Sequence, residues 1–290
     1  MTVPGEVGDI AGKLVVVTGA SSGIGLAACE ALAARGARLV LVGRNEKKTE
    51  ACAETLRSAG AEARVELCDM SRLDDIRAMG ERLRGRGDRV DVLVNNAGGV
   101  FTDRMSTAEG HEMTFGVNHL GYFLTTLELL PLLRAAPAAR IVTVASSAHQ
   151  RARIDLQDLN LERRGYSAML AYANSKACNI LFSLELARRL DGTSITANSL
   201  HPGVVATGFG QNTPGLLKTL MRLGAPLLSR PDTGAQTTVH LATSREVDGV
   251  SGRYFARSRE AQPKKHATNP ELARGLWEAS EAMVGATLAG

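Results

Sequence analysis

The sequence lacks any apolar run that approaches the ~20 residues needed to cross a bilayer as a helix. Residues 1–12 contain Glu6 and Asp9 and have no apolar core, so we expect no secretory signal peptide. Internal repeats, low-complexity stretches and linkers are also missing from the 290 residues. We therefore expect a single domain over residues 1–290.

Cysteine is scarce, and neither basic nor acidic residues clearly predominate. The four cysteines have no metal-ligand spacing, and we interpret them as reduced thiols of a cytoplasmic protein: Cys29, Cys52, Cys68 and Cys178. The 34 basic and 30 acidic residues leave a net charge of +4, which is too small and too mixed to indicate a nucleic-acid partner. A hydrophobic content of 44% allows a sizeable core.

Buried strands and helices alternate along the chain. We expect strands at residues 13–18, 38–42, 64–68, 90–94, 140–144 and 195–200, and a short last one at Tyr254 and Phe255. We expect helices at residues 26–35, 46–58, 71–84, 171–190, 233–243 and 270–284, and two helical stretches in 107–133. This alternation predicts an α/β fold with a doubly wound parallel sheet of about seven strands and helices on both faces.

A glycine-rich turn follows the first expected strand. Gly19 permits positive φ, while Gly23 and Gly25 let the backbone approach a bound group closely. The helix that begins here directs free N–H groups at the turn, which favours a pyrophosphate, and Ser21 and Ser22 add hydroxyl donors. The spacing Gly-x-x-x-Gly-x-Gly differs from the Gly-x-Gly-x-x-Gly fingerprint. Its place between a strand and a helix nevertheless indicates nucleotide binding rather than a plain turn.

A phenol and an amine stand four residues apart in the longest helical stretch. Tyr172 and Lys176 are at i and i+4, so both lie on one face of the helix. A nearby ammonium lowers the pKa of a phenol, which suits Tyr172 to general acid/base catalysis. Tyrosine and lysine also take this spacing by chance on solvated helices, so the pair alone does not decide the function.

Several motifs occur together in one order: Thr18-Gly19-Ala-Ser-Ser-Gly23-Ile-Gly25, Asn95-Asn96-Ala97-Gly98, Tyr172-x-x-x-Lys176 and Pro202-Gly203. With them the chain resembles the short-chain dehydrogenase/reductase family over nearly its whole length. Segments 117–121, 170–176, 186–190 and 276–280 resemble the retinol-dehydrogenase-type branch of that family. The resemblance implies a single-domain Rossmann fold and an NAD(P)-dependent enzyme that interconverts a carbonyl and an alcohol.

The resemblance also implies roles for individual residues. The catalytic set is Tyr172, Lys176, Ser146 and Asn118. The cofactor-binding set is Gly19, Ser21, Ser22, Gly23, Ile24, Gly25, Arg44, Asp69, Asn95, Ala97, Gly98, Tyr172, Lys176, Pro202, Gly203, Val205 and Thr207. In this scheme Asp69 meets the adenine amine, Thr207 lies near the nicotinamide amide, and Asn118 holds a water in a proton relay. Ser147 is the alternative to Ser146.

The cofactor choice depends on the residue that follows the second strand. A carboxylate there binds the ribose 2′-OH of NAD, whereas an arginine accommodates a 2′-phosphate. Arg44 stands there, and the first carboxylate is Glu46, so we expect NADP(H) to be favoured over NAD(H). The alternative is an Arg44 side chain that stacks over adenine and does not discriminate.

The substrate is less defined by the sequence. An apolar face in the variable segment 203–230 favours a substrate lid and a lipophilic small molecule, although a helix packed on the core or on a partner fits equally. His149, Gln150 and Arg151 are candidates to contact its polar groups. Rival functions are another redox reaction, such as double-bond reduction or epimerisation, and a non-catalytic NADP sensor.

Helices at residues 116–133 and 171–190 resemble a dimer interface, so we expect a homo-oligomer, either a dimer or a tetramer. Trp277 either covers an oligomer surface or stays within its own subunit. The remaining expectations are absences: we expect no metal, no nucleic acid and no membrane span.

Overall fold

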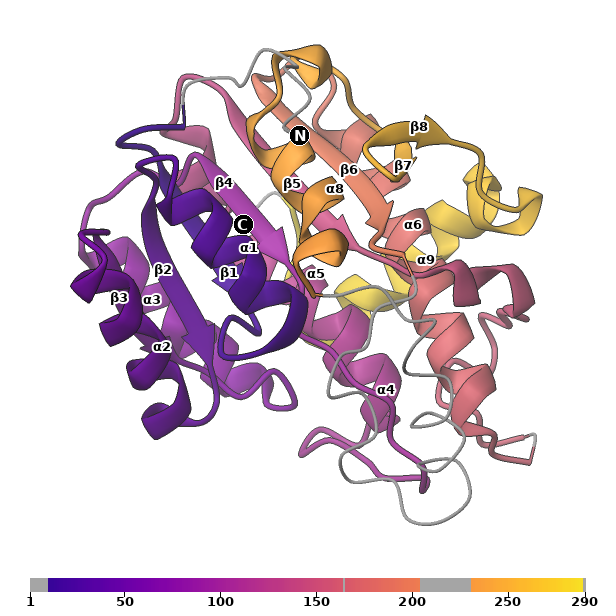
Figure 1. The fold of residues 1–290 in the computed structure, drawn as a ribbon. Helices are drawn as coiled ribbons and strands as arrows, with labels where there is room; N and C mark the ends of the chain where they lie inside the picture. The colour runs from indigo at the N-terminus through magenta and orange to yellow at the C-terminus, as the bar shows by residue number, and fades with distance from the viewer. Residues whose placement is uncertain (1–9, 164, 204–230, 289–290) are drawn as a thin grey trace.

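A computed structural model describes residues 10–163, 165–203 and 231–288 and places them around one eight-stranded sheet (Figure 1). The strand order is β3-β2-β1-β4-β5-β6-β7-β8. All neighbouring strands are parallel except β7 and β8. The strands are β1 (Leu14–Thr18), β2 (Arg38–Gly43), β3 (Ala63–Leu67), β4 (Val92–Asn95), β5 (Ala139–Val144), β6 (Ile195–His201), β7 (Tyr254–Ala256) and β8 (Arg259–Ala261).

Both faces of the sheet are buried, which explains the continuous apolar runs in the central strands. In β1, Leu14 and Val16 belong to one hydrophobic cluster, while Val15 and Val17 belong to the cluster on the opposite face. This alternation is the two-residue period of a strand. The expected doubly wound α/β fold is confirmed.

Helices lie on both faces of the sheet (Figure 1). One face carries α1 (Gly23–Ala33), α2 (Glu46–Ser58) and α8 (Pro231–Thr243). The other carries α3 (Leu73–Gly85), α5 (Gly121–Arg134), α6 (Ala168–Arg189) and α9 (Pro270–Val284). The shorter elements are α4 (Met113–Phe115), η1 (Gly116–Leu120), η2 (Ser147–Arg151), η4 (Arg245–Val247) and η5 (Lys265–Thr268).

Helix α9 packs against α6 and closes the second face. Its Trp277 is 1% exposed and stacks on Phe182, with ring centroids 5.9 Å apart and planes inclined by 8°. A hydrogen bond of 2.9 Å joins His119 Nε2, in η1, to Ser280 Oγ in α9. Trp277 therefore stays within its own subunit, and α9 is fastened to the turn that precedes α5.

Some sequence expectations need correction. The sheet has an eighth strand, β8, which forms a three-residue antiparallel edge without an apolar pattern. Residues 107–112 are not helical: Ser106 and Glu112 form an isolated bridge, and α4 begins at Met113, where Glu112 caps the first turn. Helix α6 starts at Ala168 because Ser167 caps it.

Among the residues that the structure describes, no helix combines the length and the apolar character needed to span a membrane.

Candidate active site

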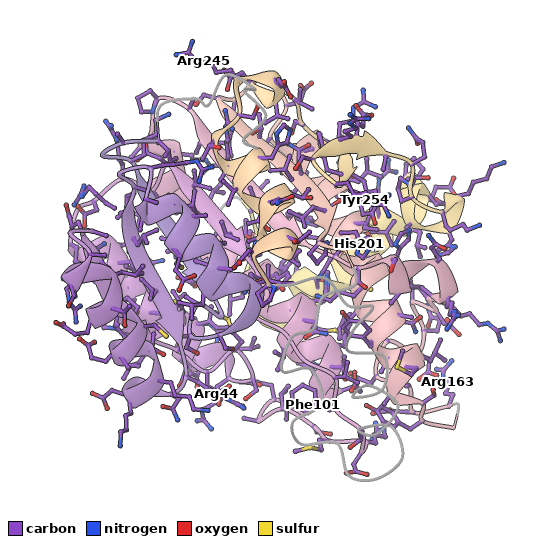
Figure 2. The ribbon with its side chains drawn as sticks, in the orientation of Figure 1. Arg44, Phe101, Arg163, His201, Arg245 and Tyr254 are labelled. Atoms are coloured by element: carbon purple, nitrogen blue, oxygen red, sulfur yellow. The ribbon has the colours of Figure 1, made fainter. Side chains whose placement is uncertain are left out.

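The strand order reverses between β1 and β4, which is the topological switch point of a doubly wound sheet. Ligands in such folds bind beside the carboxyl ends of the strands at this point. The sequence-predicted residues of the described chain follow strand ends or lie in the helices around this edge. In Figure 2, Arg44 and Phe101 lie along the lower side of the molecule, toward which the parallel strands point.

The glycine turn after β1 is packed against the turn after β4. Gly19 has φ of 67°, and a Cβ added there would meet Ala97 Cα at 2.7 Å. A Cβ on Gly25 would lie 2.3 Å from the Gly19 carbonyl oxygen and 2.5 Å from Asn96 Nδ2. Side chains at positions 19 and 25 would therefore push the two turns apart. The positive φ predicted at Gly19 is confirmed, whereas the packing of one turn on the other is a finding of the structure.

Two residues without a predicted individual role hold these turns together. Thr18 Oγ1 accepts the N–H groups of Asn96 at 2.9 Å and Ala97 at 3.0 Å. Asn96 Nδ2 donates to the Thr18 carbonyl oxygen at 2.8 Å. Asn95, a member of the predicted cofactor-binding set, donates from Nδ2 to Thr126 Oγ1 at 3.0 Å. Both Thr18 and Asn96 stand inside the quoted motifs, so motif membership was the available signal.

The first turn of α1 suits a pyrophosphate. Ser22 occupies the N-cap with φ of −169°, and no described side chain caps the helix. The free N–H groups and the helix dipole therefore face the glycine turn. Gly23 opens the helix with φ of 56°, while Ser22 is exposed and Ser21 and Ile24 are half-buried beside it. These residues fit a dinucleotide phosphate group.

The next two strand ends carry Arg44 and Asp69. Arg44 follows β2, is exposed, and makes no hydrogen bond or ion pair within the described chain. Asn45 beside it caps α2 by accepting the Lys48 N–H at 2.9 Å. Asp69 follows β3, and its Oδ1 accepts the N–H and the hydroxyl of Ser71 at 2.9 and 2.8 Å. One carboxylate oxygen is thus used to shape the chain, and its contact with adenine stays a prediction.

Tyr172 and Lys176 lie on one face of α6, as their spacing predicted. Lys176 is 3% exposed, and its Nζ donates to the Val144 carbonyl oxygen at 3.0 Å. The Nζ lies 5.7 Å from the centroid of the Tyr172 ring and 5.6 Å from that of Tyr122. The ammonium is therefore enclosed by two phenol rings and the end of β5.

Burial dominates the electrostatics of this pair. It lowers the pKa of Lys176 to about 7, because few polar partners replace the lost water. It raises the pKa of Tyr172 above 10.0, and a hydrogen bond with Ser146 opposes that rise. Burial thus outweighs the hydrogen bond in setting the Tyr172 pKa, and the expected lowering of that pKa by Lys176 stays a prediction.

Ser146 follows β5, and the buried His149 holds its carbonyl group. The Ser146 Oγ accepts the Ala148 N–H at 3.2 Å, and its hydroxyl makes the hydrogen bond that opposes the rise of the Tyr172 pKa. His149 Nδ1 lies 2.6 Å from the Ser146 carbonyl oxygen. Because a carbonyl only accepts, this nitrogen carries the proton, and Nε2 accepts the Lys264 N–H at 3.3 Å.

His201, at the end of β6, supports the same turn. Its Nδ1 accepts the N–H of Ser147 at 3.2 Å, and burial lowers its pKa to about 4. Burial also lowers the pKa of His149, whose ring meets that of Tyr254 edge-on at 5.4 Å. Figure 2 shows His201 and Tyr254 close together at this end of the sheet. His149 is 1% exposed and cannot contact a substrate, which corrects one of the three expected polar contacts.

Asn118 lies in η1, a π-helical turn between α4 and α5. Its Oδ1 accepts the Gly99 N–H at 2.9 Å, and its Nδ2 donates to the Gly99 carbonyl at 2.9 Å and to Ser175 Oγ at 3.0 Å. A Cβ on Gly98 would lie 2.9 Å from Asn118 Oδ1 and 3.7 Å from Lys176 Nζ. Asn118 thus joins the turn after β4 to α6, and its part in a water relay stays a prediction.

Two more residues at the site had no predicted role. Asn179 Nδ2 shares the Val144 carbonyl oxygen with Lys176, at 3.2 Å. It stands seven positions after Tyr172, on the same helix face, so helical spacing was the available signal. Tyr122 is fully buried beside Lys176, and nothing in its sequence context distinguished it from the apolar core.

The turn after β6 is described only in part. Pro202 and Gly203 follow the end of β6, and Gly203 has φ of 91°. Val205 and Thr207, and the rest of the expected lid segment up to residue 230, lie outside the described residues.

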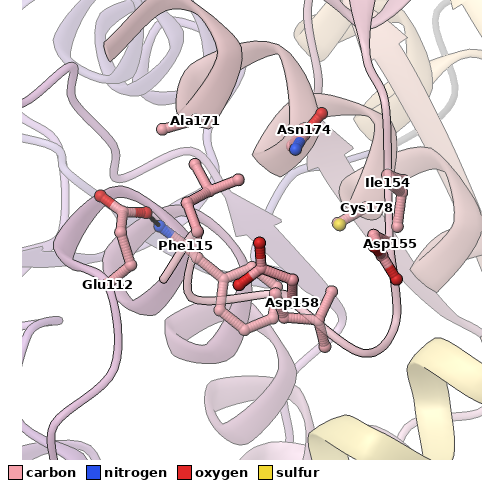
Figure 3. A pocket seen from close by; sticks show the side chains of 10 residues that line it. Glu112, Phe115, Ile154, Asp155, Asp158, Ala171, Asn174 and Cys178 are labelled. Atoms are coloured by element: carbon pink, nitrogen blue, oxygen red, sulfur yellow. Dashed lines mark hydrogen bonds between the residues drawn. The ribbon is translucent and has the colours of Figure 1, made fainter. Parts of the chain in front are cut away.

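Two cavities adjoin α6. A cleft of about 640 Å³ begins at Ser146 and runs between η2 and the first turns of α6, past Leu170 and Ala173. A smaller cavity of about 10 Å³, between α6 and Phe115, has room for about one water (Figure 3). The carboxylates of its Glu112 and Asp158 already accept backbone N–H groups. Of these two cavities, only the cleft can admit a substrate.

The described chain contains no group of three or more His, Cys, Asp or Glu residues arranged to hold a metal ion. The four cysteines are free, and three of them are buried.

Comparison with known proteins agrees with this geometry. The sequence profile of the short chain dehydrogenases matches residues 13–215. Human retinol dehydrogenase 14 is 41% identical over 299 residues, which cover 97% of this chain and 89% of that protein. Human retinol dehydrogenase 13 is 40% identical over 283 residues, which cover 95% and 86%.

Solved structures show the same fold. A crystal structure of an uncharacterised protein from Mycobacterium paratuberculosis has a TM-score of 0.81 and 32% identity, and the match covers 98% of this chain and 97% of that one. Pseudomonas aeruginosa RhlG, solved as an NADP complex, has a TM-score of 0.69 and 27% identity, with 86% and 95% covered.

The fold and the switch-point site define a nicotinamide-dependent oxidoreductase with a Rossmann sheet. The chain belongs to the short-chain dehydrogenase/reductase family, in its retinol-dehydrogenase-type branch. It is accordingly an enzyme that acts on CH–OH or C=O groups with an NAD(P) cofactor.

Proposed function

We propose that this enzyme interconverts a ketone or aldehyde and the corresponding alcohol of a lipophilic small molecule, prefers NADP(H), and uses Tyr172 as general acid/base. The observation that carries the proposal is the convergence of Tyr172, Ser146 and Lys176 on one strand end, that of β5. This place adjoins the mouth of the cleft and the turn after β4, which in turn packs on the glycine turn.

The proposed chemistry divides between the cofactor and the chain. The nicotinamide supplies or accepts the hydride. Ser146, whose hydroxyl bonds to Tyr172, would donate its proton to the substrate oxygen and orient it. Tyr172 gives that oxygen a proton during reduction and removes it during oxidation. Lys176, with a pKa of about 7, becomes fully charged when the neighbouring phenol ionises and so stabilises the phenolate.

The cofactor preference rests on the exposed, unpaired Arg44 at the end of β2. The residues that directly follow β2 are Arg44 and Asn45, so no carboxylate there would repel a 2′-phosphate. The guanidinium of Arg44 can donate paired hydrogen bonds to that phosphate. We expect NADP(H) to bind about ten-fold tighter than NAD(H), or more, in fluorescence titrations. Equal affinities, or an unchanged preference in Arg44→Ala, would remove the support for this choice.

The proposal of a lipophilic substrate rests on the apolar wall that α6 gives the cleft. Met169 is 51% exposed, and Leu170 and Ala173 continue the apolar surface toward Tyr172. A screen of aliphatic and aromatic aldehydes, ketones and alcohols, followed by reduced-nicotinamide absorbance, identifies the reaction. Product analysis separates carbonyl reduction from double-bond reduction and epimerisation.

The decisive variant is Tyr172→Phe, which removes one hydroxyl at the centre of the site. We expect turnover to fall by about 10²-fold or more, while the affinity for NADPH changes little. Tyr122→Phe is the matched control, because its hydroxyl has no hydrogen-bond partner in the described chain and its ring would stay against Lys176. Retained turnover in Tyr172→Phe contradicts the assigned role.

A further inference from the structure

The cleft beside Ser146 has two chemically different walls. The wall formed by α6 is apolar and includes Met169 and Leu170. The opposite wall, from η2 and the chain after it, carries Arg151 and Arg153. Both arginines are exposed, and none of the described residues that line the cleft is acidic.

Neither guanidinium has a partner in the described chain. Arg153 uses its backbone N–H and carbonyl to bind the Asn174 side chain, at 2.7 and 3.3 Å, and this fixes the start of its side chain against α6. Many arginines elsewhere on the described surface pair with a carboxylate, as Arg64 does with Asp88 and Arg188 with Glu185. The cleft therefore presents two uncompensated positive charges beside an apolar surface.

The positions of these charges set the shape of the ligand. Ser146, which would hold the reacting oxygen, directly precedes η2, and Arg151 is the last residue of η2. Five residues of 3₁₀ helix rise about 10 Å. The backbone of Arg151 thus lies about 10 Å beyond Ser146 along this wall, a span that an extended apolar chain of a substrate can bridge. Guanidinium groups bind carboxylates through paired N–H donors.

We infer that the substrate class is an amphipathic oxo acid or hydroxy acid: an aliphatic chain with the reacting carbon near one end and a carboxylate near the other. The chain lies along Met169 and Leu170, and Arg151 and Arg153 bind the carboxylate. This assignment rests on the proposed function, because it takes Ser146 as the place of the reacting oxygen. It makes the two arginines specificity-determining residues and gives them no part in the hydride transfer.

The test compares three aldehydes of equal chain length in the presence of NADPH: azelaic semialdehyde, its methyl ester, and nonanal. We expect KM for the carboxylate to be about ten-fold lower than for the ester, with similar kcat. The ratio of the two KM values should shrink as the salt concentration is raised, because the arginines are exposed. In the double variant Arg151→Ala/Arg153→Ala the KM values for carboxylate and ester should become about equal, while kcat and KM for nonanal stay at their wild-type values.

Arg163→Ala is the matched control, because Arg163 is an exposed arginine of the same connection that does not line the cleft, and Figure 2 shows it near the edge of the molecule. It should keep the full preference for the carboxylate. Equal KM values for acid and ester in the wild-type enzyme overturn the inference. So does a preference that survives in the double variant.

A binding measurement separates this inference from the reaction itself. Sodium nonanoate, which has no carbonyl to reduce, should bind the wild-type enzyme and Arg163→Ala in calorimetry and bind the double variant about ten-fold more weakly. If no aldehyde is reduced but nonanoate binds in this pattern, the proposed reaction fails and the anion site stands. If nonanoate binds all three proteins alike, the anion site is refuted.

Discussion

Lys176 should make the enzyme less stable than a variant that lacks it. The side chain is 3% exposed and makes one hydrogen bond, to the Val144 carbonyl oxygen. Burial lowers its pKa from 10.5 to about 7, and by linkage this shift costs about 4 kcal/mol at pH 7. Lys176→Met keeps much of the volume and removes the charge. The Val144 oxygen retains Asn179 as a donor, so the lost hydrogen bond costs about 1 kcal/mol.

The sign of the pH dependence follows from the lowered pKa. Between pH 7 and 10.5 the unfolded chain binds the Lys176 proton more strongly than the folded protein does, so the stability of the wild type rises with pH in this window. The penalty falls from about 4 kcal/mol at pH 7 to about 2 kcal/mol at pH 9. We therefore expect Lys176→Met to be more stable by about 3 kcal/mol at pH 7 and about 1 kcal/mol at pH 9.

Urea unfolding of the cofactor-free proteins at the two pH values measures this difference. Lys48→Met, at an exposed position on α2, is the control and should differ from the wild type by little at either pH. A Lys176→Met variant that is no more stable at pH 7, or whose advantage does not shrink at pH 9, would refute the reasoning. If the same variant also loses turnover, Lys176 is a residue that the enzyme needs for catalysis and that lowers its stability.

Two further variants probe the positioning of the site. Gly25→Ala places a Cβ 2.3 Å from the Gly19 oxygen and should weaken NADPH binding about ten-fold or more in titration, whereas Gly85→Ala, with open space around it, should not. His149→Leu removes the donor to the Ser146 carbonyl and should lower kcat by about 10²-fold. His149→Asn keeps an N–H near the Nδ1 position and should retain much of the wild-type kcat. If kcat falls equally in both variants, His149 does not position Ser146.

The cofactor half of the site was predictable because its chemistry is local. Gly19 stands in a turn between a strand and a helix, and that context alone predicted its positive φ. The Tyr172–Lys176 face follows from helical spacing. Parallel strands place their carboxyl ends on one edge, so Asn95 and Ser146 were expected near each other.

The remaining features depend on contacts between distant segments. The lowered pKa of Lys176 requires knowledge of Tyr122 and of the end of β5, which enclose it. The burial of His149 depends on Lys264, more than a hundred residues away along the chain. Strand β8 has no apolar pattern because it is an exposed edge. Oligomerisation and cytoplasmic location stay predictions.

The hydrogen bond between His119 and Ser280 gives the last helix a part in holding the candidate site. Asn118 and His119 are adjacent in one π-helical turn; the first binds Gly99 and Ser175, and the second binds α9. A change at Ser280 can therefore reach Asn118 through the backbone of this turn, although the two residues are more than 160 positions apart in the sequence.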